Sequence, residues 1–208
     1  LKPFKLINQY LHFYIFSMKK NKKIEATAFI LIGGQSKRFG SVKWKEKINE
    51  VMILDHIWNC CKNFQSRFLI GKNNSTHNNY DYISDELTIQ SPISGIYSAL
   101  NHSKTDWNMI LSCDLPLLKS NILEKIWVKA EKKFDVIIPY VNDYHQYTCA
   151  LYNKKCLPTI KSNINSGFYS IHNIVKQLKS SDIIFKNEVA FFNMNTRKDY
   201  EKIKAIIK

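Results

Sequence analysis

The order of apolar and polar positions predicts strands that alternate with helices through most of the chain. Short apolar runs rich in β-branched residues fit buried strands, whereas apolar residues that recur every three or four positions fit helices. Strands are expected at residues 28–32, 67–70, 82–84, 107–113, 134–141, 148–153 and 183–185. Helices are expected at 51–64, from 92 onward, and at 121–132, 157–164, 170–178 and 196–207.

This rhythm of strand, helix and strand is typical of a parallel α/β sheet. Asp143 to Tyr147 turns the chain, so the strand 148–153 is expected to pair antiparallel with 134–141. The sequence contains no internal repeat and no linker-like stretch. We therefore predict one three-layer αβα, Rossmann-like domain over residues 23–208, with a mostly parallel sheet and an antiparallel addition.

The first residues, 1–22, differ from the rest. Their apolar run, Leu11 to Phe16, is too short to span a bilayer, and no small-residue cleavage site follows it. Met18 stands just before a basic segment that ends at Lys23. We expect an N-terminal extension that is poorly ordered or forms a short amphipathic helix, without stable membrane insertion.

Composition limits the kinds of ligand that the protein is expected to bind and the cellular compartment in which it is expected to work. A hydrophobic fraction of 45% is that of a globular protein, and a formal charge of +14 suits an anionic ligand. The lysines are spread along the chain, which fits a solvated surface and argues against nucleic-acid binding. The five cysteines show no C-x-x-C pair and no zinc-ligand spacing. They are expected to be buried side chains in a reducing, cytoplasmic setting.

A glycine pair, Gly33-Gly34, ends the strand 28–32. Adjacent glycines remove every Cβ from the turn, so peptide N–H groups can approach a phosphate oxygen closely. Lys37, Arg38 and Lys43 follow, and an arginine in a lysine-rich chain indicates a need for its planar fork. The spacing fits neither G-x-x-x-x-G-K-[ST] nor G-x-G-x-x-G. The loop predicts an anion site; the plain alternative is a glycine turn with a solvated basic tail.

Polar residues follow three other predicted strands: Asn73, Asp85 and Asp114. Parallel sheets bind ligands at the carboxyl ends of their strands, where a carboxylate can meet a hard cation and a phosphate. An unpaired carboxylate after a buried strand is costly, so a metal or a helix N-terminus must satisfy Asp114. Ser120 is the better N-cap for the helix 121–132. Without further support, a plain turn residue is the better interpretation of Asn73.

The glycine loop resembles the signature L-x-G-G-x-S-x-R-[MF]-G-x-x-K of the molybdenum cofactor guanylyltransferases, the nucleotidyltransferases that attach GMP to molybdopterin. The loop residues that match are Leu31, Ile32, Gly33, Gly34, Arg38, Gly40 and Lys43. Further matches follow in the family's order at Asn73, Asp85, Ser91–Gly95, Cys113–Pro116, Cys149–Tyr152 and Asn193–Thr196. The resemblance covers roughly residues 26 to 205.

The resemblance implies transfer of GMP from GTP to the terminal phosphate of molybdenum-molybdopterin, with Mg²⁺ as cofactor. It implies nucleotide binding by Leu31, Ile32, Gly33, Gly34, Lys43, Asn73, Asp85 and Asp114. The implied catalytic residues are Arg38, Lys43 and Asp114, of which Asp114 would hold the metal, and Asn193 and Asn195 would lie near the pterin. Further implied partners are molybdenum-insertion proteins and acceptor molybdoenzymes.

Some positions depart from the family pattern. Ile32, Phe39, Ser91 and Arg197 replace an alanine, a methionine, a glycine and a proline, and the G-x-P turn near Glu50 is missing. None of these changes removes a charged catalytic group. Relatives that transfer CMP usually carry alanines where this chain has paired glycines, which favours guanine. The alternatives are a molybdopterin cytidylyltransferase, another nucleotidyltransferase of the same fold, and a non-catalytic nucleotide-binding protein.

Overall fold

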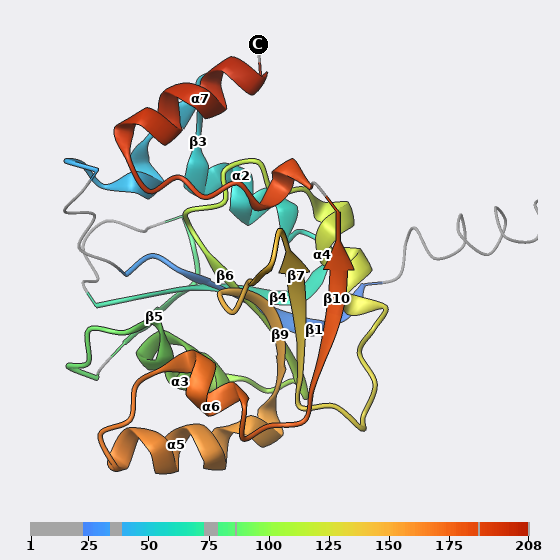
Figure 1. Cartoon of the computed structure of the whole chain (residues 1–208). Coiled ribbons are helices and arrows are strands. Elements are labelled where there is room, and N and C mark those ends of the chain that lie inside the picture. Colours follow the sequence, from blue (N-terminus) through green and yellow to red (C-terminus); the bar gives the residue numbers. More distant parts are fainter. Residues whose placement is uncertain (1–22, 34–38, 73–78, 86, 187, 208) are drawn as a thin grey trace, which may run out of the picture.

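The computed structural model describes residues 23–33, 39–72, 79–85, 87–186 and 188–207 (Figure 1). The predicted N-terminal extension, residues 1–22, lies outside the described residues. The same holds for three residues of the predicted site, Gly34, Arg38 and Asn73.

A central sheet of eight strands runs through the described part of the chain, in the order β10-β7-β9-β6-β1-β4-β5, with β8 paired to β7. The strands are β1 (Ile24–Leu31), β4 (Phe64–Gly71), β5 (Tyr82–Ser84), β6 (Trp107–Ser112), β7 (Val136–Val141), β8 (Tyr144–His145), β9 (Cys149–Asn153) and β10 (Ser180–Phe185). β1 is parallel to both β4 and β6, whereas β9 is antiparallel to β6 and β7. The predicted mostly parallel sheet with an antiparallel addition is therefore confirmed.

Helices cover both faces of this sheet (Figure 1). On one face lie α3 (Pro92–His102), α5 (Leu157–Asn165) and α6 (Ile171–Val175), and on the other lie α2 (Ile53–Cys60), α4 (Ser120–Trp127) and α7 (Arg197–Ile207). Successive strand residues point to opposite faces, so Phe29 and Ile110 belong to the core beneath α3, while Ala28 and Met109 belong to the core beneath α2. The three-layer αβα prediction is confirmed.

Several helix boundaries differ from the predicted ones: α2, α4 and α6 end three to five residues early, at Cys60, Trp127 and Val175. Two helix starts also differ. The helix expected from Val51 begins at Ile53, because Val51–Met52 forms β3 and pairs with β2 (Lys47–Ile48). The two residues between these strands have φ of 48° and 64°, as a tight hairpin turn requires. The predicted N-cap at Ser120 is wrong: Lys119 occupies the capping position without a side-chain bond, and Ser120 is the first helical residue.

Candidate active site

The carboxyl ends of β1, β4 and β6 border a pocket of about 720 Å³. Six residues of the predicted site line it: Leu31, Ile32, Gly33, Lys43, Asp85 and Asp114. They come from segments that are far apart in sequence and meet because the strands are neighbours in the sheet. The fold thus brings the described nucleotide-binding candidates together, while Asn193 and Asn195 are not among the described residues that line this pocket.

Asp114 lies just after β6 and is half-buried. The hydroxyl of Ser112 donates a short hydrogen bond to its Oδ1, and the hydroxyl of Thr148 contacts the same serine Oγ at 3.3 Å. The protein itself therefore supplies a partner for this carboxylate, which sequence reasoning missed. Since an ionised carboxylate offers about four lone-pair sites, one hydroxyl leaves capacity for a cation.

Asn195 joins the pocket through Lys43. The Lys43 ammonium donates to Asn195 Oδ1 at 2.9 Å, although the two residues are 152 positions apart in sequence. Next to Asn195, the amide of Met194 donates to the Asp114 carbonyl at 2.8 Å. The Asn193–Thr196 segment therefore contacts both the predicted phosphate-binding lysine and the backbone of the predicted metal ligand. Asn193 itself is half-buried.

The start of α7 holds this segment in place. Asp199 accepts from the amides of Asn195 and Thr196 at 3.1 and 2.8 Å, and from the Thr196 hydroxyl at 2.9 Å. The Thr196 hydroxyl in turn accepts from the Asp199 amide, which completes a capping box. The hydrogen bond from the Thr196 hydroxyl is the main cause that lowers the pKa of Asp199. Helix capping therefore orients Asn195 toward Lys43.

Two further contacts fix α7 against the chain that follows the glycine loop. Arg197 pairs with Glu46 at 3.1 Å and lies over the ring of Tyr200, 4.6 Å from its centroid. The Tyr200 hydroxyl donates to the Lys47 carbonyl at 2.6 Å. Arg197, which departs from the family's proline, thus acquires a packing role at the first turn of the helix.

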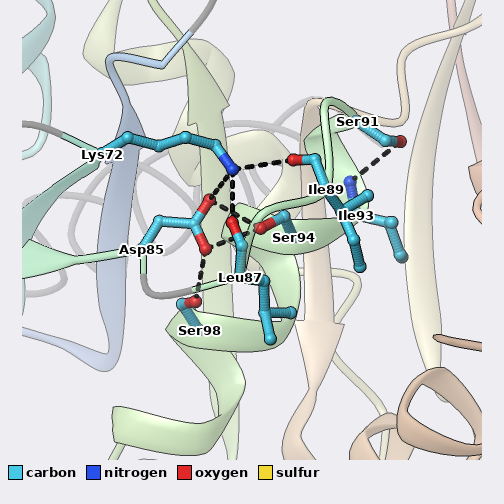
Figure 2. Close-up of polar contacts among 8 residues, drawn as sticks. All are labelled: Lys72, Asp85, Leu87, Ile89, Ser91, Ile93, Ser94 and Ser98. Atoms are coloured by element: carbon cyan, nitrogen blue, oxygen red, sulfur yellow. Dashed lines mark hydrogen bonds and ion pairs between the residues drawn. The ribbon is translucent and has the colours of Figure 1, made fainter. Parts of the chain in front are cut away.

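The Asp85 carboxylate is buried, with 9% of the residue exposed, and lies among hydroxyl groups of α3 (Figure 2). The hydroxyl of Ser94 lies 2.6 and 2.7 Å from its two oxygens, and the hydroxyl of Ser98 donates to Oδ1 at 3.0 Å. The Lys72 ammonium lies 3.8 Å from Oδ2. The spacing of Ser94 and Ser98 by one helical turn is the only sequence signal for this arrangement.

Lys72 also ties the end of β4 to the wall of the pocket. Its ammonium donates to the carbonyls of Leu87 and Ile89, the latter at 2.8 Å (Figure 2). Lys72 and Ile89 both line the pocket. Because one ammonium bonds two carbonyls of the same short segment, it holds that segment close to the strand end.

Two glycines control the approach of the backbone at this site. A Cβ added to Gly95 would lie 2.9 Å from Leu31 Cδ2, so this glycine allows α3 to pack against the end of β1. A Cβ added to Gly33 would meet no atom of the described residues within 4 Å. The backbone at Gly33 therefore borders open space, as the sequence prediction of a close phosphate approach requires.

Cys113 lines the pocket beside Asp114, but its chemistry is that of a buried side chain. Burial, reinforced by the Asp114 carboxylate, raises the pKa of its thiol far above the usual range. All five cysteines are free and buried, and burial raises the pKa of Cys60 to about 11. Since the thiolate is the nucleophilic form, Cys113 is protonated at neutral pH and is no candidate nucleophile.

The described residues contain no group of three or more His, Cys, Asp or Glu side chains arranged to hold a metal ion. Mg²⁺ in nucleotide sites is commonly held by one or two carboxylates together with substrate phosphates. A half-buried Asp114 at the pocket edge fits that mode of binding.

Comparison with known protein families identifies the family to which this chain belongs. A family profile described as the MobA-like NTP transferase domain matches residues 28–181, more than half of the chain. The chain belongs to the MobA-like NTP transferase family. The matched range contains the glycine loop, Asp85 and Asp114, whereas the Asn193–Thr196 segment and α7 lie beyond it.

Individual MobA-like proteins agree with this assignment. A Campylobacter jejuni subsp. doylei protein named "Molybdenum cofactor guanylyltransferase" is 28% identical over 187 residues, which cover 88% of this chain and 98% of that protein. An Aquifex aeolicus protein named "Probable molybdenum cofactor guanylyltransferase" is 29% identical over 185 residues, covering 86% and 90%. The crystal structure of molybdopterin-guanine dinucleotide biosynthesis protein A from Archaeoglobus fulgidus shares the fold, with a TM-score of 0.75, 21% identity and coverage of 87% and 98%.

None of the helices described in this MobA-like chain is long and apolar enough to cross a membrane.

Proposed function

We propose that this MobA-like protein is a molybdenum cofactor guanylyltransferase, which transfers GMP from GTP to the terminal phosphate of molybdenum-molybdopterin. The observation that carries the proposal is one pocket that gathers Gly33, Lys43 and Asp114 from three separate segments. The names of the curated relatives support the same reaction. Acceptor molybdoenzymes and molybdenum-insertion proteins are the expected protein partners, in the cytoplasm.

In this reaction an oxygen of the acceptor phosphate forms a bond to the α-phosphorus of GTP. The bond from that phosphorus to the bridging oxygen breaks, and pyrophosphate leaves with the electron pair. The attacking oxygen is already anionic, so no protein nucleophile is needed, in agreement with the protonated Cys113. Catalysis then depends on positioning and on neutralising the phosphate charge.

The described residues divide this work. Lys43 contributes positive charge beside the triphosphate, and Gly33 admits a phosphate oxygen close to the backbone. Asp114 would hold Mg²⁺, which supplies charge neutralisation at the phosphates when bound. Gly34 and Arg38 are assigned to the triphosphate, and Asn73 to the base, by resemblance alone, because they lie outside the described residues.

Asp85 is assigned to the guanine edge. Its Oδ1 accepts from both Ser94 and Ser98, whereas Oδ2 accepts from Ser94 and lies 3.8 Å from the Lys72 ammonium. Oδ2 therefore keeps capacity to accept from a base N–H group, since each carboxylate oxygen has two lone pairs. Asn193 and Asn195 are assigned to the acceptor side of the pocket, next to Lys43.

The deciding experiment is nucleotide selectivity. The protein is incubated with molybdenum-molybdopterin, Mg²⁺ and one labelled nucleoside triphosphate at a time, and both nucleotide transfer and pyrophosphate release are measured. Transfer from GTP with pyrophosphate release is the expected result. Preference for CTP would assign the protein to the cytidylyltransferases, and nucleotide binding without pyrophosphate release would make it a non-catalytic binder.

Replacing Lys72 by methionine is expected to raise the KM for GTP ~5–10-fold, with a smaller effect on kcat. The substitution removes the charge-assisted bonds to the Leu87 and Ile89 carbonyls, so the pocket wall loosens. Steady-state kinetics with GTP varied provide the measurement. The matched control is Lys125→Met on the exposed side of α4, and equal effects in both variants would show that Lys72 acts only through net charge.

Replacing Gly33 by alanine is expected to raise the KM for GTP at least ~10-fold without lowering the melting temperature by more than a few degrees. The added methyl group meets no atom within 4 Å in the part of the chain that the structure describes, so its cost is to the bound phosphate rather than to the fold. Thermal unfolding and GTP kinetics measure the two effects separately. Wild-type KM in a folded Gly33→Ala variant would place the phosphate elsewhere.

A further inference from the structure

Four aromatic rings form a row: Tyr140 of β7, His145 of β8, Tyr147 in the turn before β9, and His172 of α6. The ring centroids of Tyr140 and His145 lie 4.9 Å apart, and those of His145 and Tyr147 lie 5.6 Å apart in a stacked arrangement. Tyr147 meets His172 edge-on at 6.0 Å, and its hydroxyl hydrogen bonds to His172 Nδ1 at 2.8 Å. We call this set the aromatic row.

The aromatic row adjoins the active-site pocket at two points. Thr148, next to Tyr147, lines the pocket and contacts Ser112. Ser91 also lines the pocket, and its hydroxyl donates to the Tyr169 carbonyl at 3.0 Å, three residues before His172. Tyr147 and His172, at one end of the row, are therefore linked to the pocket rim by short stretches of chain.

The position of the row in the sheet sets its distance from Asp114. β6 and β7 are both antiparallel to β9, which lies between them, so their carboxyl ends share one edge of the sheet. Neighbouring strands are ~4.8 Å apart, so the ends of β6 and β7 are ~10 Å apart. That span suits an acceptor whose ring carries a short side chain ending in phosphate.

The strands on the other side of β6 carry the residues assigned to the nucleotide. β1, β4 and β5 follow β6 in that direction, and Asp85, the residue assigned to guanine, comes directly after β5. A nucleotide whose phosphates lie near Lys43 and Asp114 would therefore place its base on the β5 side. The aromatic row lies on the other side, where an acceptor must enter to reach the α-phosphorus.

The chemistry of the row favours stacking over charge recognition. His145 lies 3.1 and 3.2 Å from the two Asp182 oxygens, and Tyr147 is bonded to His172, so the polar edges have internal partners. The side chain of His145 is 33% exposed and His172 is exposed. His145 and Tyr147 already stack on each other and both are partly exposed, so a flat heteroaromatic ligand would extend this stack on its solvent side.

We propose that the aromatic row is the acceptor subsite, on which the heteroaromatic ring of the acceptor stacks against Tyr147 and His145. The acceptor phosphate then extends along the Thr148 and Ser112 side of the pocket toward Asp114. This subsite rests on the proposed function for the identity of the acceptor. It adds the residues that distinguish a ring-bearing acceptor from a sugar phosphate.

The test compares Tyr147→Ala and His145→Ala with the wild-type protein. Each variant is expected to raise the KM for molybdenum-molybdopterin ~5–50-fold and to leave the KM for GTP within about twofold, since only ring stacking is lost. Tyr147→Phe keeps the ring and is expected to stay near wild type. The matched control is Tyr144→Ala, because Tyr144 is 73% exposed and its side chain points to the opposite side of β8 from His145.

A binding arm separates this proposal from the proposed function. Binding of neopterin, a soluble fluorescent pterin, is measured without any nucleotide for all four variants. Weaker neopterin binding in Tyr147→Ala and His145→Ala supports the subsite even if wild-type protein transfers no GMP, a result that would contradict the proposed function alone. Unchanged neopterin binding and unchanged acceptor KM in a folded His145→Ala protein would overturn the subsite.

Discussion

Replacing Asp114 by asparagine is expected to lower kcat for GMP transfer by ~100-fold or more while the protein remains folded. Asparagine has nearly the same volume as aspartate and can still accept the hydrogen bond from the Ser112 hydroxyl. What it loses is the negative charge that would hold a cation between the phosphates. Removing one group that stabilises charge in a transition state typically costs ~100–1,000-fold in rate.

The measurement is kcat at saturating GTP over a Mg²⁺ titration, with thermal unfolding as the check on folding. The matched control is Ser112→Ala, which removes the hydroxyl partner and keeps the carboxylate, and is expected to cost less than ~10-fold. If Asp114→Asn reached the wild-type rate at high Mg²⁺, the carboxylate would not be an essential metal ligand. A comparable loss in both variants would assign the effect to the hydrogen bond instead.

The sheet could be predicted from sequence because its strands are short, apolar and bounded by turn residues. The runs that became β1 and β6 are buried along almost their whole length, a pattern that excludes an edge position. The position of β9 could not be predicted. Its own pattern indicated a strand antiparallel to β7, but its insertion between β7 and β6 depends on contacts with residues about 40 positions earlier, which no local period encodes.

Two parts of the site differ in how far the sequence predicts them: the strand ends that carry Gly33 and Asp114, and the contact between Lys43 and Asn195. Gly33 and Asp114 follow neighbouring parallel strands, so their proximity follows from the fold class alone. The contact between Lys43 and Asn195 requires α7 to dock beside the glycine-loop segment, which the Arg197 to Glu46 pair and the capping box achieve. The Lys43 and Arg197 pairs are tertiary contacts between polar side chains and leave no periodic signal in the sequence. The capping box is local, and the spacing of Thr196 and Asp199 by three residues is visible in the sequence.

Asp85 shows how packing changes the interpretation of a single residue. From sequence it is a carboxylate at a strand end, free to recognise a base. In the structure three of its neighbours are the hydroxyls of Ser94 and Ser98 and the ammonium of Lys72 (Figure 2). A buried carboxylate requires such partners, and here they come from the helix that also forms the pocket wall. The proposed base recognition by Asp85 would therefore be coupled, through this one side chain, to the position of that wall.

Replacing Lys43 by methionine is expected to lower kcat/KM for GTP by ~100-fold or more, the second large effect. Lys43 lines the pocket, and its ammonium, 2.9 Å from Asn195 Oδ1, is held by a neutral partner that does not cancel its charge. A positive charge at this place would stabilise a triphosphate, whose charge develops further as pyrophosphate leaves. Methionine preserves the length and apolar stem of the side chain but provides no donor.

The control for Lys43 comes from the same short helical turn. Lys45 is two residues away and exposed, and its ammonium lies over the Trp44 ring at 5.2 Å. Lys45→Met therefore changes the net charge equally and is expected to lower kcat/KM less than ~3-fold.

Asn195→Ala removes only the partner that orients the Lys43 side chain and is expected to lower kcat/KM ~5–10-fold. In the Lys43→Met background the asparagine has no ammonium left to orient, so adding Asn195→Ala should cost little more. Fully additive losses in the double variant would show that Asn195 acts on the acceptor independently of Lys43. Equal losses of kcat/KM for Lys43→Met and Lys45→Met would show that both lysines act only through the net positive charge.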